Sequence, residues 1–110
     1  MKRHELRELI VGGESSTVEF KRRFTSAEKI AKEIIAFANT SGGYLIFGVD
    51  DDGSIVGVDS EKEQIALIEI ARHSIVPDLH LLVDVVEIEY RDVVVVTVPN
   101  SHDKPHRLIS

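Results

Sequence analysis

The chain has 110 residues, of which 43% are hydrophobic and 29% charged, with no cysteine and a formal net charge of -6 at pH 7. This composition is typical of one globular domain spanning residues 1–110, and it excludes disulfide bonds and thiolate metal sites. No apolar stretch approaches the ~20 residues of a membrane span and the N-terminus is charged, so we expect a cytoplasmic protein without a membrane partner.

The first predicted elements are a short helix and a strand. Residues 4–10 show an amphipathic helical pattern that stops at the glycine pair 12–13. In residues 17–22, apolar and polar side chains alternate, which is typical of a half-buried strand. Glu19 and Lys21 share the outward face of this strand.

A second helix is predicted to begin at Thr25. Thr25 and Glu28 have the spacing of a capping box, in which each residue satisfies a free backbone amide of the other. Apolar residues then recur at helical spacing up to Asn39, where we expect the helix to end. The pair Gly42-Gly43 tolerates the left-handed conformation that is common at helix exits.

A hairpin and a third helix follow. Residues 44–49 are almost continuously apolar, which predicts a strand covered on both faces. Residues 54–59 are predicted to return as its hairpin partner after an aspartate-rich turn. Ser60 and Glu63 form a second capping box, which opens a helix that stops before Pro77.

A last hairpin is predicted from residues 85–90 and 93–98, with its turn at Arg91-Asp92. The second of these strands is apolar throughout, which indicates a central position in the sheet. The order of elements is α-β-α-β-β-α-β-β. We therefore predict an α+β fold in which helices pack on a mixed or mostly antiparallel sheet.

A family resemblance is carried jointly by the segments GESSTVEFKR, IIAFANTSGGYLIFGVDDDGSIVGVD, IVPDL and VVVVTVPNSHDKPH. Together they resemble the Schlafen-type Alba-like (AlbA_2) domain, over about residues 13–105. The resemblance implies a nucleic-acid-binding domain, for DNA or RNA, of the kind found in prokaryotic transcriptional regulators. It also implies two alternatives, a metal-dependent endoribonuclease and an ATP-binding domain. Family members often continue past the Lys-Pro segment, so the chain resembles the N-terminal part of a longer protein.

The distribution of charge is consistent with a nucleic-acid partner. Residues 1–32 hold eight Lys and Arg against five acidic residues, whereas residues 33–110 hold five against fourteen. Binding to a polyanion depends on the local potential of one face, so the acidic total does not exclude it. The predicted phosphate contacts are Lys21, Arg22, Arg23, Lys29 and Lys32. The alternative for residues 21–23 is that they solvate a strand end.

The segment Asn39–Gly43, which we call the glycine elbow, is the second predicted contact. Gly42 and Gly43 allow a sharp turn that would bring backbone N–H groups to the surface. With the side chains of Asn39, Thr40 and Ser41, these groups would form a nest for a phosphate. The alternative is that the glycines only end the helix and permit close packing on the sheet.

The nuclease alternative implies a carboxylate site for Mg²⁺ or Mn²⁺; a domain that only binds needs no cofactor. By resemblance, its ligands would be Glu14 and Glu19, with Asp50 or Asp51 as the third. Carboxylates and phosphate oxygens are the hard ligands that these cations prefer. The alternatives are that Glu14 caps a turn, Glu19 pairs with a nearby cation and the aspartates form a solvated tip.

Two features of the sequence remain open. The tail holds Lys104 and Arg107, which either extend a basic surface or belong to an unstructured end. A homodimer would form through the apolar strand 93–98 or through the N-terminal helix. The phenylalanines fall on apolar faces, so backbone contacts are expected rather than base stacking.

Overall fold

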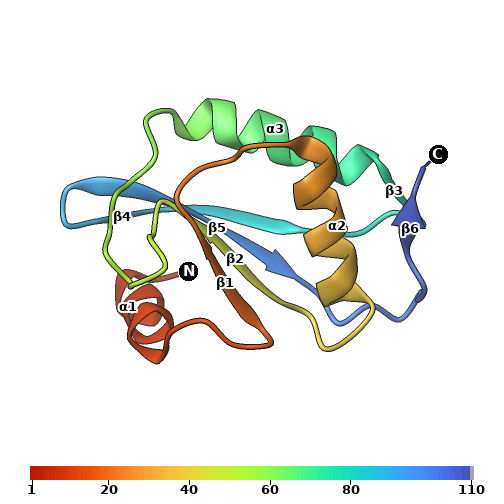
Figure 1. Cartoon of the computed structure of the whole chain (residues 1–110), viewed down its shortest axis with the longest axis horizontal. Coiled ribbons are helices and arrows are strands. Elements are labelled where there is room, and N and C mark those ends of the chain that lie inside the picture. Colours follow the sequence, from red (N-terminus) through yellow and green to blue (C-terminus); the bar gives the residue numbers. More distant parts are fainter. Residues whose placement is uncertain (110) are drawn as a thin grey trace.

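The computed structural model describes residues 1–109, and Figure 1 shows how its elements are arranged. Among these residues, no helix is both long enough and apolar enough to cross a membrane. The described elements, in chain order, are α1 (Arg3–Gly12), β1 (Val18–Lys21), α2 (Ala27–Ala38), β2 (Gly43–Phe47), α3 (Glu61–His73), β3 (Ile75–Val76), β4 (Leu82–Ile88), β5 (Arg91–Val98) and β6 (Arg107–Leu108).

Four strands form the main sheet in the order β1-β2-β5-β4. β1 runs parallel to β2, and the other two pairs are antiparallel. The short strands β3 and β6 form a separate antiparallel pair. The prediction of an α+β fold with a mostly antiparallel sheet is confirmed, and β5 is central as its apolar sequence indicated.

Both faces of the sheet are covered by helices, and successive side chains of a strand point to opposite faces. On β2, Leu45 and Phe47 belong to the core cluster beneath α2 and α3, whereas Ile46 packs with Leu6 of α1. The same alternation holds along β5. Figure 1 shows α2 and α3 on one side of the sheet and α1 on the other. This two-sided burial explains why the β2 and β5 sequences are apolar without a polar face.

β1 is an edge strand with one buried face. Val18 and Phe20 join the core under α1, which leaves Glu19 and Lys21 on the face that carries α2. These two side chains were predicted on an outward face, and they lie half-buried beside α2. Their position follows from β1 lying at the edge of the sheet, next to the helix.

The helix caps agree with the sequence at α3 and differ at α2. Ser60 accepts a hydrogen bond from the Glu63 amide at 3.3 Å, as predicted. The cap of α2 is Ser26, whose hydroxyl accepts from the Lys29 amide at 3.4 Å, so the prediction of Thr25 as the cap is wrong by one residue. Both are serine or threonine hydroxyls with the same capping chemistry, which the sequence alone could not separate.

The predicted strand 54–59 is absent from the structure. Only an isolated bridge between Val49 and Ile55 survives of that hairpin. The amides of Val56 and Gly57 both donate to the Gly48 carbonyl, so the chain folds back across the end of β2 as a loop.

The turn of the last hairpin is also displaced from its prediction. β4 ends at Ile88 and β5 begins at Arg91, so the turn residues are Glu89 and Tyr90. Both have positive φ, 51° and 62°, as a two-residue hairpin turn of the type I′ geometry requires. Arg91-Asp92 carries turn-like polar residues but belongs to the strand.

The C-terminal segment folds back against the end of α2. The Asn39 side chain donates to the His106 carbonyl at 3.1 Å and accepts from the His106 amide at 2.8 Å. The ring of His106 is buried and bonds to Ser101 and to the Pro77 carbonyl. The predicted alternative of an unstructured end therefore does not hold for residues 101–108, which pack against the rest of the fold.

Candidate nucleic-acid interface

The cations that follow β1 and the glycine elbow lie at opposite ends of the sheet. β1 and β2 are parallel, with Val18 beside Tyr44 and Lys21 beside Phe47. The elbow precedes β2, whereas Arg22 and Arg23 follow β1, so about 13 Å of strand separates them. Figure 1 shows the elbow at the end of α2 and the 22–26 loop at the far end of β1. The structure does not bring these two predicted contacts together.

The glycine elbow is used by the fold itself. The amides of Asn39, Thr40 and Gly42 donate to carbonyls in the last turn of α2. A Cβ on Gly42 would lie 2.7 Å from the Asn100 nitrogen, and one on Gly43 would lie 2.6 Å from the Phe37 ring. The glycines are therefore required for close packing on β5 and α2, as in the alternative stated above.

The polar side chains of the elbow also have partners within the molecule. Asn39 is engaged with His106, and the Thr40 hydroxyl donates to the Ala36 carbonyl at 2.8 Å. Ser41 is exposed. The tail cation Lys104 donates to the Thr40 carbonyl at 3.0 Å. This network ties the elbow to the C-terminal segment.

Lys21 lies between β1 and α2, where it forms ion pairs with two carboxylates. Its ammonium lies 2.6 Å from Glu33 Oε1 and 3.6 Å from Glu19 Oε1. Its side chain is only 20% exposed. Among the predicted cations, Lys21 is thus the one whose charge is already neutralised by two carboxylates.

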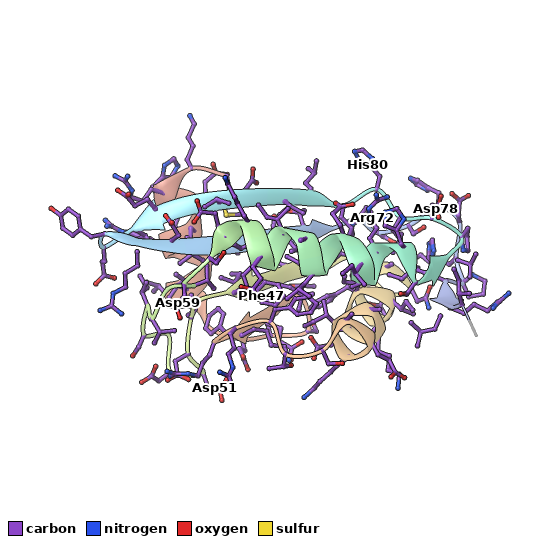
Figure 2. The ribbon with its side chains drawn as sticks, turned by 90° about the horizontal axis from the view of Figure 1, so that it is seen from above. Phe47, Asp51, Asp59, Arg72, Asp78 and His80 are labelled. Carbon is purple, nitrogen blue, oxygen red and sulfur yellow. The ribbon has the colours of Figure 1, made fainter. Side chains whose placement is uncertain are left out.

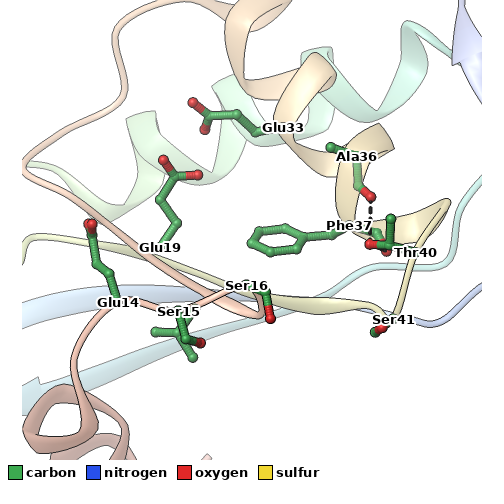
Figure 3. A pocket seen from close by; sticks show the side chains of 10 residues that line it. Glu14, Ser15, Ser16, Glu19, Glu33, Ala36, Phe37, Thr40 and Ser41 are labelled. Atoms are coloured by element: carbon green, nitrogen blue, oxygen red, sulfur yellow. Dashed lines mark hydrogen bonds between the residues drawn. The ribbon is translucent and has the colours of Figure 1, made fainter.

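Three glutamates line a pocket of about 480 Å³ between β1 and α2. Figure 3 shows the carboxylates of Glu19 and Glu33 turned toward each other, with the ring of Phe37 below them. Glu14 lines the same pocket, and its Oε1 accepts the amide proton of Phe20 at 3.0 Å. Glu14 thus satisfies a backbone group of the edge strand. Glu33 was missed because it lies on a different element from the motif that contains the other two.

The electrostatics of this pocket are those of crowded carboxylates around one ammonium. Burial, together with the charge of Glu33, raises the pKa of Glu19, although Lys21 acts in the opposite direction. Burial lowers the pKa of Lys21, but the hydrogen bond and charge of Glu33 outweigh it, so that pKa is raised. The second oxygen of Glu33, Oε2, is buried without a hydrogen-bond partner.

The predicted metal ligands are not assembled around one point. Asp50 accepts from Arg22 at 2.6 Å beyond the end of β1, and Asp51 is exposed at the outer tip of its loop (Figure 2). Neither residue lines the pocket that holds Glu14 and Glu19. Within residues 1–109, no group of three or more His, Asp or Glu side chains is placed to hold a metal ion. This donor arrangement, with Lys21 between Glu19 and Glu33, does not fit Mg²⁺ or Mn²⁺.

Arg22 and Arg23 line a second pocket of about 530 Å³. Its other wall comes from residues 56–60 and the first turns of α3, with Asp59 beside the start of that helix (Figure 2). Both arginines are exposed. Lys29 and Lys32 are exposed on α2, where Lys32 pairs with Glu28 at 3.4 Å.

Further arginines lie at the same end of the molecule. Arg91 donates to the Val56 carbonyl at 3.1 Å, which connects the β4–β5 hairpin to the loop beside Arg22 and Arg23. On the other side of the hairpin, Arg3 and Arg7 of α1 line a hollow with Tyr90. We call the five side chains at this end the arginine end: Arg3, Arg7, Arg22, Arg23 and Arg91.

Four of the five guanidinium groups at the arginine end have no carboxylate of the described residues within ion-pair distance, although Asp59, Glu63, Glu87 and Glu89 line the same hollows. All five side chains are exposed, and they are five of the seven arginines in the sequence. Among the described residues, only Arg22 of the five forms an ion pair with a carboxylate. Arg3, Arg7 and Arg91 were not predicted, because they come from two other segments, α1 and the start of β5, which the fold brings to the same end as Arg22 and Arg23. Their exposed positions in a helix and a strand end were the only sequence signal.

Comparison with known proteins gives one family match. The model of the family described as Schlafen, AlbA_2 matches residues 14–109. A segment of 52 residues is 44% identical to an uncharacterised ATP-binding protein, UU034, from Ureaplasma parvum, and covers 44% of this chain. The matched segment represents 15% of that relative's length.

Two solved structures share the fold. One is the N-terminal domain of a protein from Nitrosomonas europaea whose name relates it to the ATP-dependent DNA helicase RecG, with a TM-score of 0.77 and 24% identity. The match covers 100% of this chain and 82% of that domain. The other is the DIP2311 protein from Corynebacterium diphtheriae, with a TM-score of 0.64 and 20% identity over 96% of this chain and 23% of the other.

Proposed function

The chain belongs to the Schlafen AlbA_2 family, and we propose that it is a nucleic-acid-binding domain that serves a transcriptional regulator. Its contacts would be made mainly with phosphates, through the arginine end. Guanidinium groups suit this role because they stay charged and match phosphate oxygens with paired N–H donors. The relation of one structural neighbour to a DNA helicase by name agrees with this proposal.

The observation that carries the proposal is the presence of four exposed arginines without carboxylate partners at one end of an acidic chain. Arg3, Arg7, Arg23 and Arg91 form no ion pair within residues 1–109. Acidic side chains line the same two hollows, with Asp59 and Glu63 near Arg22 and Arg23, and with Glu87 and Glu89 near Arg3 and Arg7. Phosphates would therefore be bound by individual guanidinium groups that lack a carboxylate partner, rather than by a uniformly positive face.

Fewer residues remain as phosphate contacts once those that already have partners within the fold are removed. Arg22 and Arg23 remain in it, and Lys29 and Lys32 are assigned to its margin because their head groups are exposed. Lys21 is committed to Glu33, and most of the elbow amides are bonded within the fold. We therefore do not assign a phosphate to the elbow.

The direct test is fluorescence anisotropy with labelled DNA and RNA over a salt series. We expect the affinity to fall steeply with salt, because each phosphate contact releases condensed counterions. Arg23→Ala should weaken binding of every sequence and reduce the slope of log K against log salt by about 1. Arg107→Ala is the matched control, since it removes the same exposed charge from β6 at the other end of the molecule.

Two results would contradict the proposal. Absence of binding at low salt would remove the function itself. Equal losses in the Arg23→Ala and Arg107→Ala variants would show that the arginine end is not the contact surface. Addition of ATP as a competitor tests the ATP-binding alternative in the same assay, and we expect no displacement of nucleic acid.

The nuclease alternative is tested with tRNA and Mn²⁺. Because the ammonium of Lys21 lies between the carboxylates of Glu19 and Glu33, we expect no cleavage above that of a Glu19→Ala variant. Cleavage by the wild type that Glu19→Ala abolishes would reinstate the nuclease.

A further inference from the structure

The tip of the β4–β5 hairpin has a sequence that is poorly suited to its turn. Both turn residues have positive φ, 51° at Glu89 and 62° at Tyr90. Such turns strongly favour Asn-Gly, because a Cβ at positive φ lies too close to the backbone; glycine has no Cβ, and the short polar side chain of asparagine compensates with local hydrogen bonds. A hairpin selected only for folding would not carry tyrosine here. Strain of this kind at a tip is a reason to look for a function.

Tyr90 is almost completely exposed, at 99% of its possible surface. It is the most exposed large hydrophobic residue in the described chain, whereas the other tyrosine, Tyr44, is half-buried against the α1 core. The hairpin itself projects from one end of the molecule (Figure 1). Nothing within residues 1–109 covers this ring, so both of its faces are open to a partner.

The surroundings of Tyr90 combine positive charge with a hollow. A hollow of about 330 Å³ is lined by Arg3, Arg7, Glu87, Glu89 and Tyr90. Arg3 is held in place by the Glu87 carbonyl, to which its Nε donates at 2.7 Å. This bond is to a neutral carbonyl, so it orients the guanidinium without neutralising it.

The two glutamates determine which part of a nucleic acid suits the hollow. A phosphate placed there would meet the carboxylates of Glu87 and Glu89, which disfavours a bare anion. A nucleobase carries no charge, and its amino groups can donate to carboxylates. The ring of Tyr90 offers a π-face, and every base can stack on such a face. Arg3 and Arg7, one turn apart on α1, then remain for phosphates that flank the base outside the hollow, away from the two carboxylates.

We propose that the hairpin tip is a stacking site for an unpaired nucleobase, with Tyr90 as the stacking ring and Arg3 and Arg7 as the flanking phosphate contacts. This inference rests on the proposed function and adds its substrate class, single-stranded nucleic acid or an unpaired loop. The base faces of a continuous duplex are already stacked, so a duplex offers nothing for the ring to contact.

The first test compares a labelled single-stranded oligonucleotide with the duplex of the same sequence by anisotropy. Tyr90→Ala should weaken single-strand binding at least about fivefold and change duplex binding less than about twofold. Tyr90→Phe should retain the wild-type affinity, because only the ring is needed. Ile109→Ala is the control, since it removes another exposed apolar side chain, 57% exposed, beyond β6.

The second test uses the protein's own fluorescence. The chain has two tyrosines and no tryptophan, so Tyr44→Phe leaves Tyr90 as the single emitter. Stacking of a base on Tyr90 should quench this emission in step with the anisotropy of the single strand. Emission that stays constant while the single strand saturates the protein would overturn the stacking site.

The outcomes separate this inference from the function beneath it. If the wild type binds neither nucleic acid, both proposals fall. If the wild type binds but Tyr90→Ala binds single strands equally well, only the stacking site falls and the arginine end stands.

Discussion

At the scale of single residues, Lys21 offsets part of the negative charge of the pocket between β1 and α2. Its ammonium contacts Glu33 at 2.6 Å, and both side chains are about four-fifths buried. Removal of Lys21 would leave Glu33 with one oxygen that has no partner and a second that has just lost its own. A buried carboxylate without a cation is strongly destabilising.

Lys21→Met should therefore lower the free energy of unfolding by about 2 kcal/mol. The measurement is urea denaturation of the wild type and the variant. Lys32→Met is the matched control, because its ion pair with Glu28 is exposed and should change stability by less than about 0.5 kcal/mol. Equal effects of the two substitutions would show that the Lys21 ion pair does not stabilise the pocket.

Glu19 makes the opposite contribution at neutral pH. Its pKa in the folded state is raised from the usual 4.5, first by burial and then by Glu33. The folded state therefore binds its proton more tightly than the unfolded state, so stability falls as pH rises above about 4.5 through the raised pKa. The loss of stability caused by the ionised Glu19 carboxylate is fully present above its raised pKa and absent well below pH 4.5.

Glu19→Gln should remove this cost. We expect the melting temperature to rise by about 1–4 °C at pH 7, with the gain disappearing as the pH falls below the unfolded pKa. Thermal denaturation followed by circular dichroism between pH 4 and pH 8 measures it. A gain that is independent of pH, or a loss at pH 7, would contradict the electrostatic account.

At the scale of elements, the β4–β5 hairpin that presents the Tyr90 ring is destabilised by positive φ at both turn residues. Replacement of Glu89-Tyr90 by Asn-Gly should raise the free energy of unfolding by about 1 kcal/mol, because both residues then tolerate positive φ. The same double variant should lose single-strand affinity, since it lacks the ring. The urea midpoint and the anisotropy titration measure these two changes.

Glu89→Asn alone separates the two effects. It relieves strain at the first turn residue and keeps Tyr90, so stability should rise while single-strand binding is retained. If the Asn-Gly variant is no more stable than the wild type, the turn is not strained and the argument from strain to function fails.

The elements that were predicted correctly are those in which one periodicity dominates. α2 shows helical spacing of Ile30, Ile34 and Phe37, all buried, and the apolar run of β5 fits a strand covered on both faces. The hairpin turn was misplaced because tyrosine is typical of strands, whereas Arg-Asp has turn-like polarity. No glycine or asparagine marks the true turn, so local sequence could not reveal it.

Only two of the five arginines of the arginine end could be predicted from the sequence, and the reason is topological. Arg22 and Arg23 are adjacent, so their charge is evident. Arg3, Arg7 and Arg91 come from α1 and from the start of β5, and only the pairing of the strands brings them to the same end. The glycine elbow was predicted to bind phosphate, but its glycines pack closely against Phe37 and Asn100. No local sequence pattern predicts these contacts.

At the scale of the whole molecule, a chain of net charge -6 presents one end where arginines outnumber their ion pairs. This asymmetry would orient the domain on a polyanion, with the hairpin tip and the 22–24 loop toward the nucleic acid and the C-terminal segment away from it. The solved neighbour DIP2311 is much longer than the matched region, which occupies 23% of that chain.

The most direct test of the arginine end is an NMR titration of the ¹⁵N-labelled domain with a single-stranded oligonucleotide. We predict that amide shifts cluster in residues 22–24, 55–58 and 89–92, while residues 39–43 and 104–108 keep their positions. Shifts centred on the glycine elbow and the C-terminal segment, with none at the hairpin tip, would contradict the account.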